Sequence, residues 1–237
     1  MRTVFITGAN RGIGLELVRQ YIAAGEDVHA CCRRPGGAAE LKALEKANRD
    51  RLHVHALDVT KTEAIQRLAG ALSEKPIDIL INNAGVFGPK ADSEKDLRQS
   101  LGHLDEEIVA KVMRVNAIAP MMVAQAFSDH VARSPTRKIV AISSAMGSIA
   151  QGDGGHYAYR MSKTALNMAM VTLGKDLAPR GVHVLVLCPG WVKTEMGGAQ
   201  APLTAEASVA GLRLRIDEAP RPGAPGFQLF DGTPLPW

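Results

Sequence analysis

Apolar residues fall along the chain into short continuous runs separated by longer periodic stretches. The short runs are rich in valine and isoleucine and cover residues 3–7, 27–32, 53–58, 77–82, 138–143, 183–188 and 226–230. Several are apolar almost throughout, which is typical of strands buried on both faces of a parallel sheet. The pattern therefore predicts a parallel sheet of about seven strands.

Between these runs, apolar residues recur every three to four positions, as on the buried face of an amphipathic helix. The stretches with this spacing cover residues 13–24, 62–72, 105–131, 156–177 and 205–216. Thr60, with Glu63 three positions later, predicts a capping box at the start of the second stretch.

Alternating strands and helices predict an α/β fold, in which right-handed crossovers wind the chain in both directions from the centre of the sheet. We expect a single Rossmann-like domain over residues 1–237, a doubly wound parallel sheet with helices on both faces. Residues 219–226 contain three prolines and two glycines and are expected to form a loop before the last strand.

Composition narrows the class of protein. The 237 residues are 46% hydrophobic and 22% charged, which is typical of a globular chain with a sizeable core. The N-terminal residues resemble a first buried strand more than a signal peptide, and no apolar run approaches the roughly 18 residues that a membrane span needs. We therefore expect a cytoplasmic protein without a membrane span.

Charge and cysteine content disfavour two further classes. The formal net charge is +4, but the basic residues are dispersed among acidic ones, which argues against nucleic-acid binding. Cys31 and Cys32 are adjacent and Cys188 is distant, so they match neither a disulfide framework nor the spacing of a zinc or redox pair. We expect small buried strand residues there and no metal site.

A glycine-rich turn connects the first predicted strand to the first helix. Gly8, Gly12 and Gly14 have the spacing GxxxGxG rather than the commoner GxGxxG. Glycines there permit a tight turn and close approach to a pyrophosphate, while the helix N-terminus offers free N–H groups. The loop is a candidate cofactor site, although glycines between a strand and a helix often form only a turn.

Basic residues follow the second strand, where NAD-binding folds place an acidic residue against the ribose 2′-hydroxyl. Arg33 and Arg34 stand there instead, and Arg11 adds a positive charge within the glycine loop. Guanidinium groups hold phosphates through forked hydrogen bonds, so NADP(H) is favoured over NAD. The alternative, a solvated turn with two surface arginines, leaves the missing acidic residue unexplained.

Tyr159 and Lys163 are four residues apart in a predicted helix and therefore share one face. A nearby ammonium favours the phenolate and would bring the tyrosine pKa toward working pH, which makes Tyr159 a candidate general acid or base. Tyr157 has Met161 at that offset and is excluded from such a pair. Because many helices carry this spacing by chance, it is weak evidence alone.

Two serines end the fifth predicted strand, at the sheet edge where open α/β sheets bind ligands. Ser143 and Ser144 would point in opposite directions on a continuous strand, so only one could face a substrate. A hydroxyl there could hydrogen-bond a carbonyl oxygen as negative charge develops on it. Strand geometry alone does not decide between the two.

Together, the ordered motifs resemble the short-chain dehydrogenase/reductase family over essentially the whole chain. They are the TGANRGIG segment at residues 7–14, the NNAG segment at 82–85, Asn116, the serine pair, Tyr159 with Lys163, and Pro189 with Gly190. Residues 147–149, 157–163 and 235–237 are most similar to the branch of C-factor and sniffer-type carbonyl reductases.

The resemblance implies roles for individual residues. Ser144 would polarise a carbonyl, Tyr159 would donate the proton, and Lys163 would lower the tyrosine pKa and bind the nicotinamide ribose. Asn116 would hold a water that links Lys163 to solvent. Taken with the glycine loop and the arginines, the expected cofactor contacts are Gly8, Asn10, Arg11, Gly12, Ile13, Gly14, Arg33, Arg34, Asp58, Val59, Asn82, Ala84, Gly85, Tyr159, Lys163, Pro189, Gly190, Val192 and Thr194.

We therefore expect an NADP(H)-dependent oxidoreductase that transfers a hydride between nicotinamide and the carbonyl or alcohol carbon of a small molecule. The alternative is an NADP-binding regulatory protein of the C-factor type with little catalytic role. Ser144 and Tyr159 are slightly further apart than in many members because of residues 151–156, which are expected to shape the substrate entrance.

Two further expectations concern surfaces. Phe87, Met146 and Trp191 are expected to form an apolar pocket for the substrate. The helices at 105–131 and 156–177 carry apolar residues on more than one face, so a homodimer or homotetramer is expected.

Overall fold

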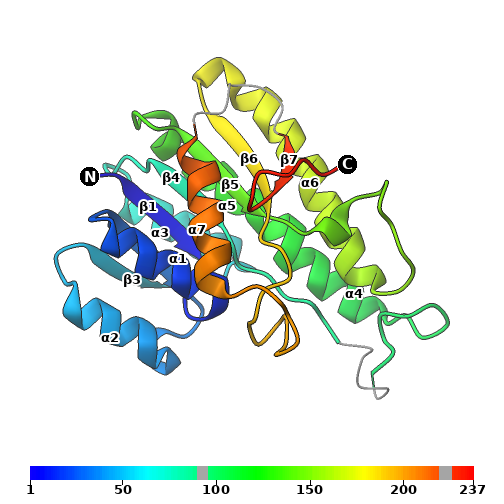
Figure 1. The fold of residues 1–237 in the computed structure, drawn as a ribbon. Coiled ribbons are helices and arrows are strands. Elements are labelled where there is room, and N and C mark those ends of the chain that lie inside the picture. The colour runs from blue at the N-terminus through cyan, green and yellow to red at the C-terminus, as the bar shows by residue number, and fades with distance from the viewer. Residues whose placement is uncertain (90–95, 219–225) are drawn as a thin grey trace.

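The computed structural model describes residues 1–89, 96–218 and 226–237 as a sheet between two layers of helices (Figure 1). Within these residues the strands are β1 (Thr3–Thr7), β2 (Asp27–Cys32), β3 (Leu52–Ala56), β4 (Ile79–Asn82), β5 (Lys138–Ile142), β6 (His183–Cys188) and β7 (Phe227–Leu229). All are parallel, in the order β3-β2-β1-β4-β5-β6-β7. The predicted doubly wound parallel sheet is confirmed.

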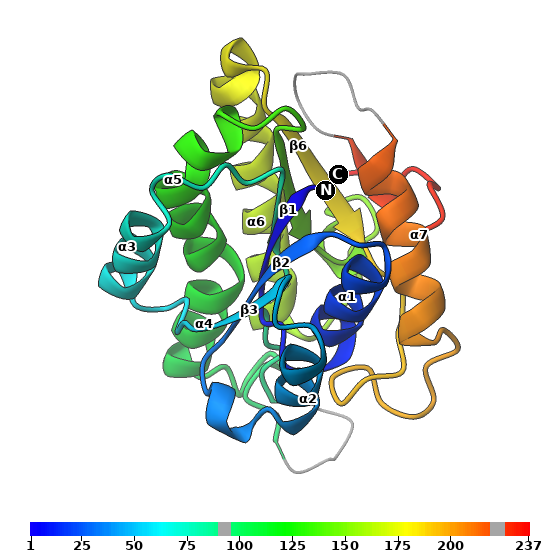
Figure 2. The ribbon, with the colours of Figure 1, turned by 90° about the vertical axis from the view of Figure 1, so that its left-hand side faces the viewer.

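The helices cover both faces of the sheet, as predicted (Figure 2). They are α1 (Gly12–Ala23), α2 (Ala39–Ala47), α3 (Thr62–Ala71), α4 (Glu106–Met113), α5 (Ala119–Ala132), α6 (Tyr157–Leu177) and α7 (Ala205–Asp217). On β1, Val4 and Ile6 are buried in the core cluster of α1, α2 and α7, whereas Phe5 is buried in the cluster of α3, α5 and α6. Side-chain alternation along the strand therefore supplies both cores.

The helix predicted at 105–131 is interrupted by a π-helical segment, η3 (Arg114–Ile118), between α4 and α5. Pro120 follows at the start of α5 and has no N–H to donate to the carbonyl of Asn116, four residues earlier. A π-turn at this position is one way to accommodate the missing hydrogen bond, and such turns are frequent at functional sites.

Two local predictions were wrong or incomplete. The capping box does not form, because the Thr60 hydroxyl donates to Asp58 Oδ1 at 2.7 Å and the N-cap of α3 is Lys61. Helix α2 was not predicted at all. Most of the expected loop at 219–226 lies outside the described residues.

The three cysteines are free and buried, as expected. Among the described residues, no helix is both long enough and apolar enough to cross a membrane.

Candidate active site

The C-terminal ends of β1 and β4 meet where the winding of the sheet reverses, the usual place for a ligand in open α/β sheets. Thr7 Oγ1 accepts hydrogen bonds from the backbone N–H groups of Asn83 and Ala84, both at 3.1 Å. Asn83 Nδ2 in turn donates to the carbonyls of Thr7 and Gly8, at 2.9 and 3.1 Å. These bonds tie the two loops together, and Asn83 is a site residue that the sequence motif contained without a stated role.

The glycine loop has no room for side chains at its closest contacts. Gly8 has a φ of 67°, and a Cβ there would lie 2.7 Å from the Cα of Ala84. A Cβ on Gly14 would lie 2.1 Å from the carbonyl oxygen of Gly8. Helix α1 begins at Gly12 with no side-chain cap, so its first N–H groups are available to an anionic ligand. This cradle fits a dinucleotide pyrophosphate.

Arg33 and Arg34 are exposed at the end of β2, in the position predicted for a 2′-phosphate. Asp58 lies near Arg33 and accepts hydrogen bonds from Thr60. Burial alone would raise the pKa of Asp58, but the Thr60 hydrogen bonds and the charge of Arg33 together lower it. Arg11 instead forms an ion pair with Glu195, in the segment that follows β6.

Tyr159 and Lys163 project from the first two turns of α6 and are both buried. Lys163 Nζ lies 5.7 Å from the centre of the Tyr159 ring and donates a 2.8 Å hydrogen bond to the Ile142 carbonyl at the end of β5. Burial lowers the pKa of Lys163 to about 8.

The Tyr159 hydroxyl is hydrogen-bonded to Ser144. Burial raises the pKa of Tyr159 to about 12, against the smaller lowering effect of Ser144. Desolvation of the enclosed phenol dominates this pKa, and the expected lowering by the Lys163 ammonium stays a prediction. Tyr159 is a protonated, neutral group at neutral pH.

The side chains of the two serines make contacts in different places, as alternation along a strand requires. Ser143 Oγ donates to Asn167 Oδ1 on α6 at 2.5 Å and is buried. Ser144 instead faces Tyr159, with its hydroxyl also accepting from the Met146 N–H at 3.2 Å. The structure thus brings Ser144, and not Ser143, to the candidate catalytic tyrosine despite the wider spacing between them.

Asn116 is fully buried in the π-helical segment. Its side-chain amide bonds both backbone groups of Val86, accepting from the N–H at 2.9 Å and donating to the carbonyl at 2.8 Å. It also donates to Ser162 Oγ at 3.0 Å, beside Lys163 on α6. Asn116 therefore holds the loop after β4 against α6, and its expected role toward a water stays a prediction.

The segment after β6 approaches the glycine loop from the other side of the crevice. Thr194 Cγ2 would lie 3.2 Å from a Cβ on Gly12. Pro189 and Val192 are buried, and Gly190 has a φ of 80°, which favours glycine. Thr194 Oγ1 accepts from the Gly197 N–H at 3.0 Å.

The remaining predicted cofactor residues differ in exposure. Asn10 is exposed, whereas Ile13, Val59 and Gly85 are half-buried. Asn82 is buried and donates through Nδ2 to the Pro120 carbonyl at 3.3 Å. The Asn82 side chain is thus engaged with α5.

Gln99 is a buried residue that sequence reasoning missed. Its Nε2 donates to the carbonyls of Phe87 and Pro89, at 2.9 and 2.5 Å. Its Oε1 accepts from the Tyr159 N–H at 3.0 Å, at the start of α6. Gln99 therefore connects the loop after β4 to the backbone that carries the candidate catalytic tyrosine.

Phe87, one of the residues predicted to line the substrate pocket, packs against Tyr159. Its ring centre is 4.5 Å from that of Tyr159 and 5.1 Å from that of His156. Trp191 is 58% exposed, with its indole N–H donating to the Gly197 carbonyl at 2.8 Å. An apolar pocket formed by Phe87, Met146 and Trp191 stays a prediction.

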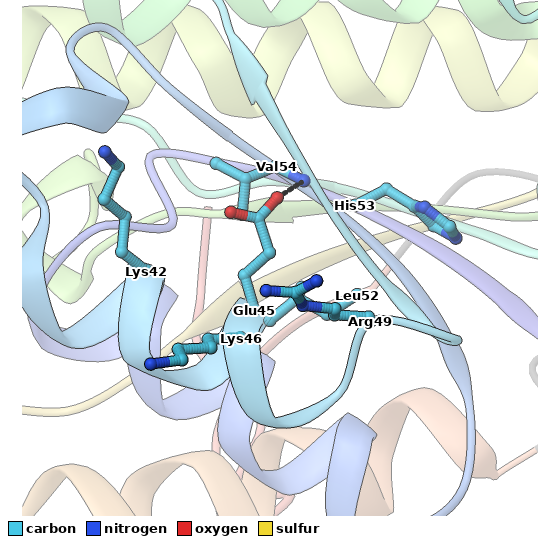
Figure 3. Close-up of a pocket in the computed structure, with 7 residues that line it drawn as sticks. All are labelled: Lys42, Glu45, Lys46, Arg49, Leu52, His53 and Val54. Carbon is cyan, nitrogen blue, oxygen red and sulfur yellow. Dashed lines mark hydrogen bonds between the residues drawn. The ribbon is translucent and has the colours of Figure 1, made fainter.

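A separate hollow of about 590 Å³ lies at the opposite side of the sheet from Tyr159, at the β3 edge (Figure 3). It is lined by Lys42, Glu45, Lys46, Arg49, Leu52, His53 and Val54. Glu45 accepts a hydrogen bond from the Val54 N–H at 3.2 Å and so satisfies a donor of this edge strand.

Known proteins resemble the chain over most of its length. Residues 2–203 match the family model described as short chain dehydrogenase. The C-signal protein of Myxococcus xanthus is 42% identical over 164 residues, which cover 68% of this chain and 93% of that protein.

Solved structures extend the likeness to the complete fold. The carbonyl reductase Sniffer of D. melanogaster has a TM-score of 0.90 and 33% identity, with 100% of both chains covered. An NADPH-bound carbonyl reductase from chicken fatty liver also has a TM-score of 0.90, at 30% identity, with 100% of this chain and 99% of that chain covered.

Proposed function

Since the chain belongs to the short chain dehydrogenase family, a family of oxidoreductases, we propose that it is an NADPH-dependent reductase of small-molecule ketones or aldehydes. The observation that carries this proposal is the convergence of Ser144, Tyr159 and Lys163 at the end of β5, next to the glycine-loop cradle. Both carbonyl reductases compared above share this fold, and one was solved with NADPH bound.

The cofactor is NADP(H) in this proposal because the residues present fit it. The tight turn through Gly8 and Gly14 leads into the uncapped N-terminus of α1, whose first N–H groups would hold a pyrophosphate. Arg33 and Arg34 offer two exposed guanidinium groups for a 2′-phosphate, at the end of β2 where an NAD-binding fold would carry an acidic residue. When bound, NADPH supplies the hydride.

The protein's own residues handle the oxygen of the substrate. Ser144 donates a hydrogen bond to the carbonyl oxygen and stabilises the negative charge that develops on it. Tyr159 gives its hydroxyl proton to that oxygen as the alcohol forms. Lys163 Nζ lies behind the Tyr159 ring and provides a positive charge that favours loss of this proton.

In the reductive direction the protonated Tyr159 is the proton donor. A carbonyl reduction needs a proton donor, and a tyrosine whose pKa is about 12 retains its proton throughout the neutral range. In the reverse direction, alcohol oxidation, the same tyrosine would accept the proton.

A Tyr159→Phe variant tests the proposal. It removes only the hydroxyl, so we expect NADPH consumption with aromatic and aliphatic carbonyls to fall by about 10²–10⁴-fold, the usual contribution of a general acid. NADPH binding, followed by fluorescence, should remain within a few-fold of wild type. Tyr157→Phe is the matched control, because Tyr157 lies two residues earlier in α6 and is half-buried, and it should keep full activity.

Turnover by Tyr159→Phe at the wild-type rate would contradict the assigned role of the tyrosine. NADPH binding without turnover of any carbonyl by the wild-type protein would favour the regulatory alternative.

A further inference from the structure

A cluster of imidazoles lies at the β2–β3 edge of the sheet, outside the candidate active site. Asp27 and His29 alternate along β2, as His53 and His55 do along β3. The strand register pairs His29 with His53. Side chains two residues apart share a face of a strand, so all four gather on one face of the sheet. Figure 3 shows the His53 ring pointing away from Lys42 and Glu45.

Three of these side chains present possible metal ligands to one point. Nitrogen or oxygen atoms of Asp27, His29 and His53 all lie within 4.8 Å of one another. His53 Nε2 is 2.9 Å from Asp27 Oδ1, and His29 Nε2 is 3.9 Å from Asp27 Oδ2. Asp27 and His29 are buried, while the His53 side chain is 38% exposed. An ion could therefore enter past His53.

His29 carries a buried nitrogen without a partner. Its Nδ1 is 2.9 Å from His55 Nε2, which occupies that side of the ring. Its Nε2 points toward Asp27 but makes no hydrogen bond, and the whole residue is 3% exposed. Buried polar atoms are nearly always satisfied, so a free nitrogen aimed into a cluster of ligands needs an explanation.

A neutral ring is the form in which histidine binds metal. The His29 ring has one lone pair directed at the cluster when Nδ1 donates to His55.

We propose that Asp27 Oδ1, His29 Nε2 and His53 Nε2 bind a divalent transition-metal ion, with Zn²⁺ as the best match. Two imidazoles and one carboxylate are a common zinc ligand set, and they leave a fourth position for water. The ion would replace the hydrogen bond between His53 and Asp27 and would join β2 to β3.

Outer contacts that orient metal ligands are already in place. His55 contacts Nδ1 of His29 and so fixes the orientation of the His29 ring. Lys75 Nζ lies 3.0 Å from Asp27 Oδ2, which leaves Asp27 Oδ1 for the ion. The ammonium of Lys75 also competes with the ion for the Asp27 charge. Removing it should therefore strengthen metal binding.

Titration of metal-free protein, without a histidine tag, tests the site at pH 7.5. We expect one Zn²⁺ per chain by calorimetry and, with Co²⁺, the visible absorption of a four- or five-coordinate ion. His29→Gln and His53→Gln should each weaken Zn²⁺ binding at least tenfold, and Lys75→Met should strengthen it. His103→Gln is the matched control, because His103 is exposed and outside the cluster.

Because His53 is partly exposed, His53→Gln should disturb the fold least among these variants. Circular dichroism verifies that each variant is folded. The proposal is overturned if the wild-type protein takes up no Zn²⁺ at micromolar concentrations. It is also overturned if His53→Gln binds Zn²⁺ as well as His103→Gln does, which would assign the uptake to adventitious surface groups.

Discussion

Lys163 shows at the scale of one residue how a catalytic requirement opposes stability. It is 5% exposed, and its ammonium has the Ile142 carbonyl as a hydrogen-bond acceptor. Burial therefore disfavours the charge and lowers the pKa of Lys163 from 10.5 to about 8. Below pH 8 the lysine is charged in both the folded and unfolded states, and the folded state bears the whole cost of desolvating it.

Replacing Lys163 by Met should therefore stabilise the cofactor-free protein at pH 7. The pKa difference corresponds to a desolvation cost of about 3 kcal/mol, which the substitution removes. The substitution also removes the hydrogen bond to Ile142, which costs about 1 kcal/mol. We expect a net gain of about 2 kcal/mol in the free energy of unfolding, measured by urea denaturation.

The sign of the pH dependence follows from the lowered pKa. As pH rises from 8 toward 10.5, the folded lysine loses its proton before the unfolded one does, so the wild-type protein recovers stability. The advantage of Lys163→Met should shrink between pH 7 and pH 9.5. An advantage that is constant with pH, or a destabilised variant at pH 7, would show that burial of the charge is not the cause.

A site residue could be predicted from the sequence only where its contact shows as a regular spacing along the chain. Tyr159 and Lys163 lie one helical turn apart, so their spacing was visible. Gln99 contacts the backbone of Tyr159 across 60 residues and follows no local pattern. Strand alternation predicted that only one serine would face the site, and the structure identifies it as Ser144.

Elements were predicted where a period was long and regular, and missed where a single side chain decides the local geometry. The stretch 105–131 has a helical period, yet Pro120 breaks its hydrogen-bond ladder near the π-turn that carries Asn116. Thr60 has the right spacing for a capping box, but Asp58 lies two residues away and takes its hydroxyl. Periodicity does not encode such competition.

The packing of the short turn η4 (Ala145–Gly147) on α6 gives a prediction at the scale of elements. A Cβ on Gly147 would lie 2.8 Å from the Cβ of Lys163 and 2.9 Å from its backbone carbonyl carbon. Gly147→Ala should push α6 away from the end of β5 and misplace Lys163 and Tyr159. Because displacement of about 1 Å can cost roughly 10²-fold in rate, we expect kcat to fall by one to two orders of magnitude.

Gly154→Ala is the matched control for this variant. It lies in the loop before α6, with no atom within 4 Å of the added Cβ, and should leave kcat unchanged. Equal kcat values for wild type and Gly147→Ala would show that α6 tolerates the shift without disturbing the reaction.

At the scale of the whole molecule, the alternation of strands and helices predicted the architecture because the central strands are buried on both faces. The same topology gathers distant motifs at the strand ends, which is why the family resemblance located the site. The Asp27, His29 and His53 cluster escaped prediction because its ligands come from two strands in register, not from a local spacing. A homo-oligomer stays a prediction, supported by exposed Met161 and Met168 on α6.

Cofactor preference is a property of the assembled molecule, because the glycine loop and the arginines follow different strands. At a concentration 100 times its Kd, NADPH should stabilise the fold by about 2.7 kcal/mol. For a chain of this length that corresponds to a rise of about 5–10 °C in Tm, which a thermal melt measures. NADH at the same concentration should raise Tm much less, since it lacks the 2′-phosphate.

The double variant Arg33→Ala, Arg34→Ala should lose most of the NADPH-induced rise and little of the small NADH effect. The double variant Lys46→Ala, Arg49→Ala, which removes two exposed basic residues at the β3 edge, controls for the change in net charge and should keep the full response to NADPH. The two phosphate-binding features act together, because the pyrophosphate on the α1 N-terminus fixes where the ribose lies and hence whether the 2′-phosphate reaches the end of β2. Equal Tm rises with NADPH and NADH in the wild-type protein would mean that the two arginines do not contact the cofactor.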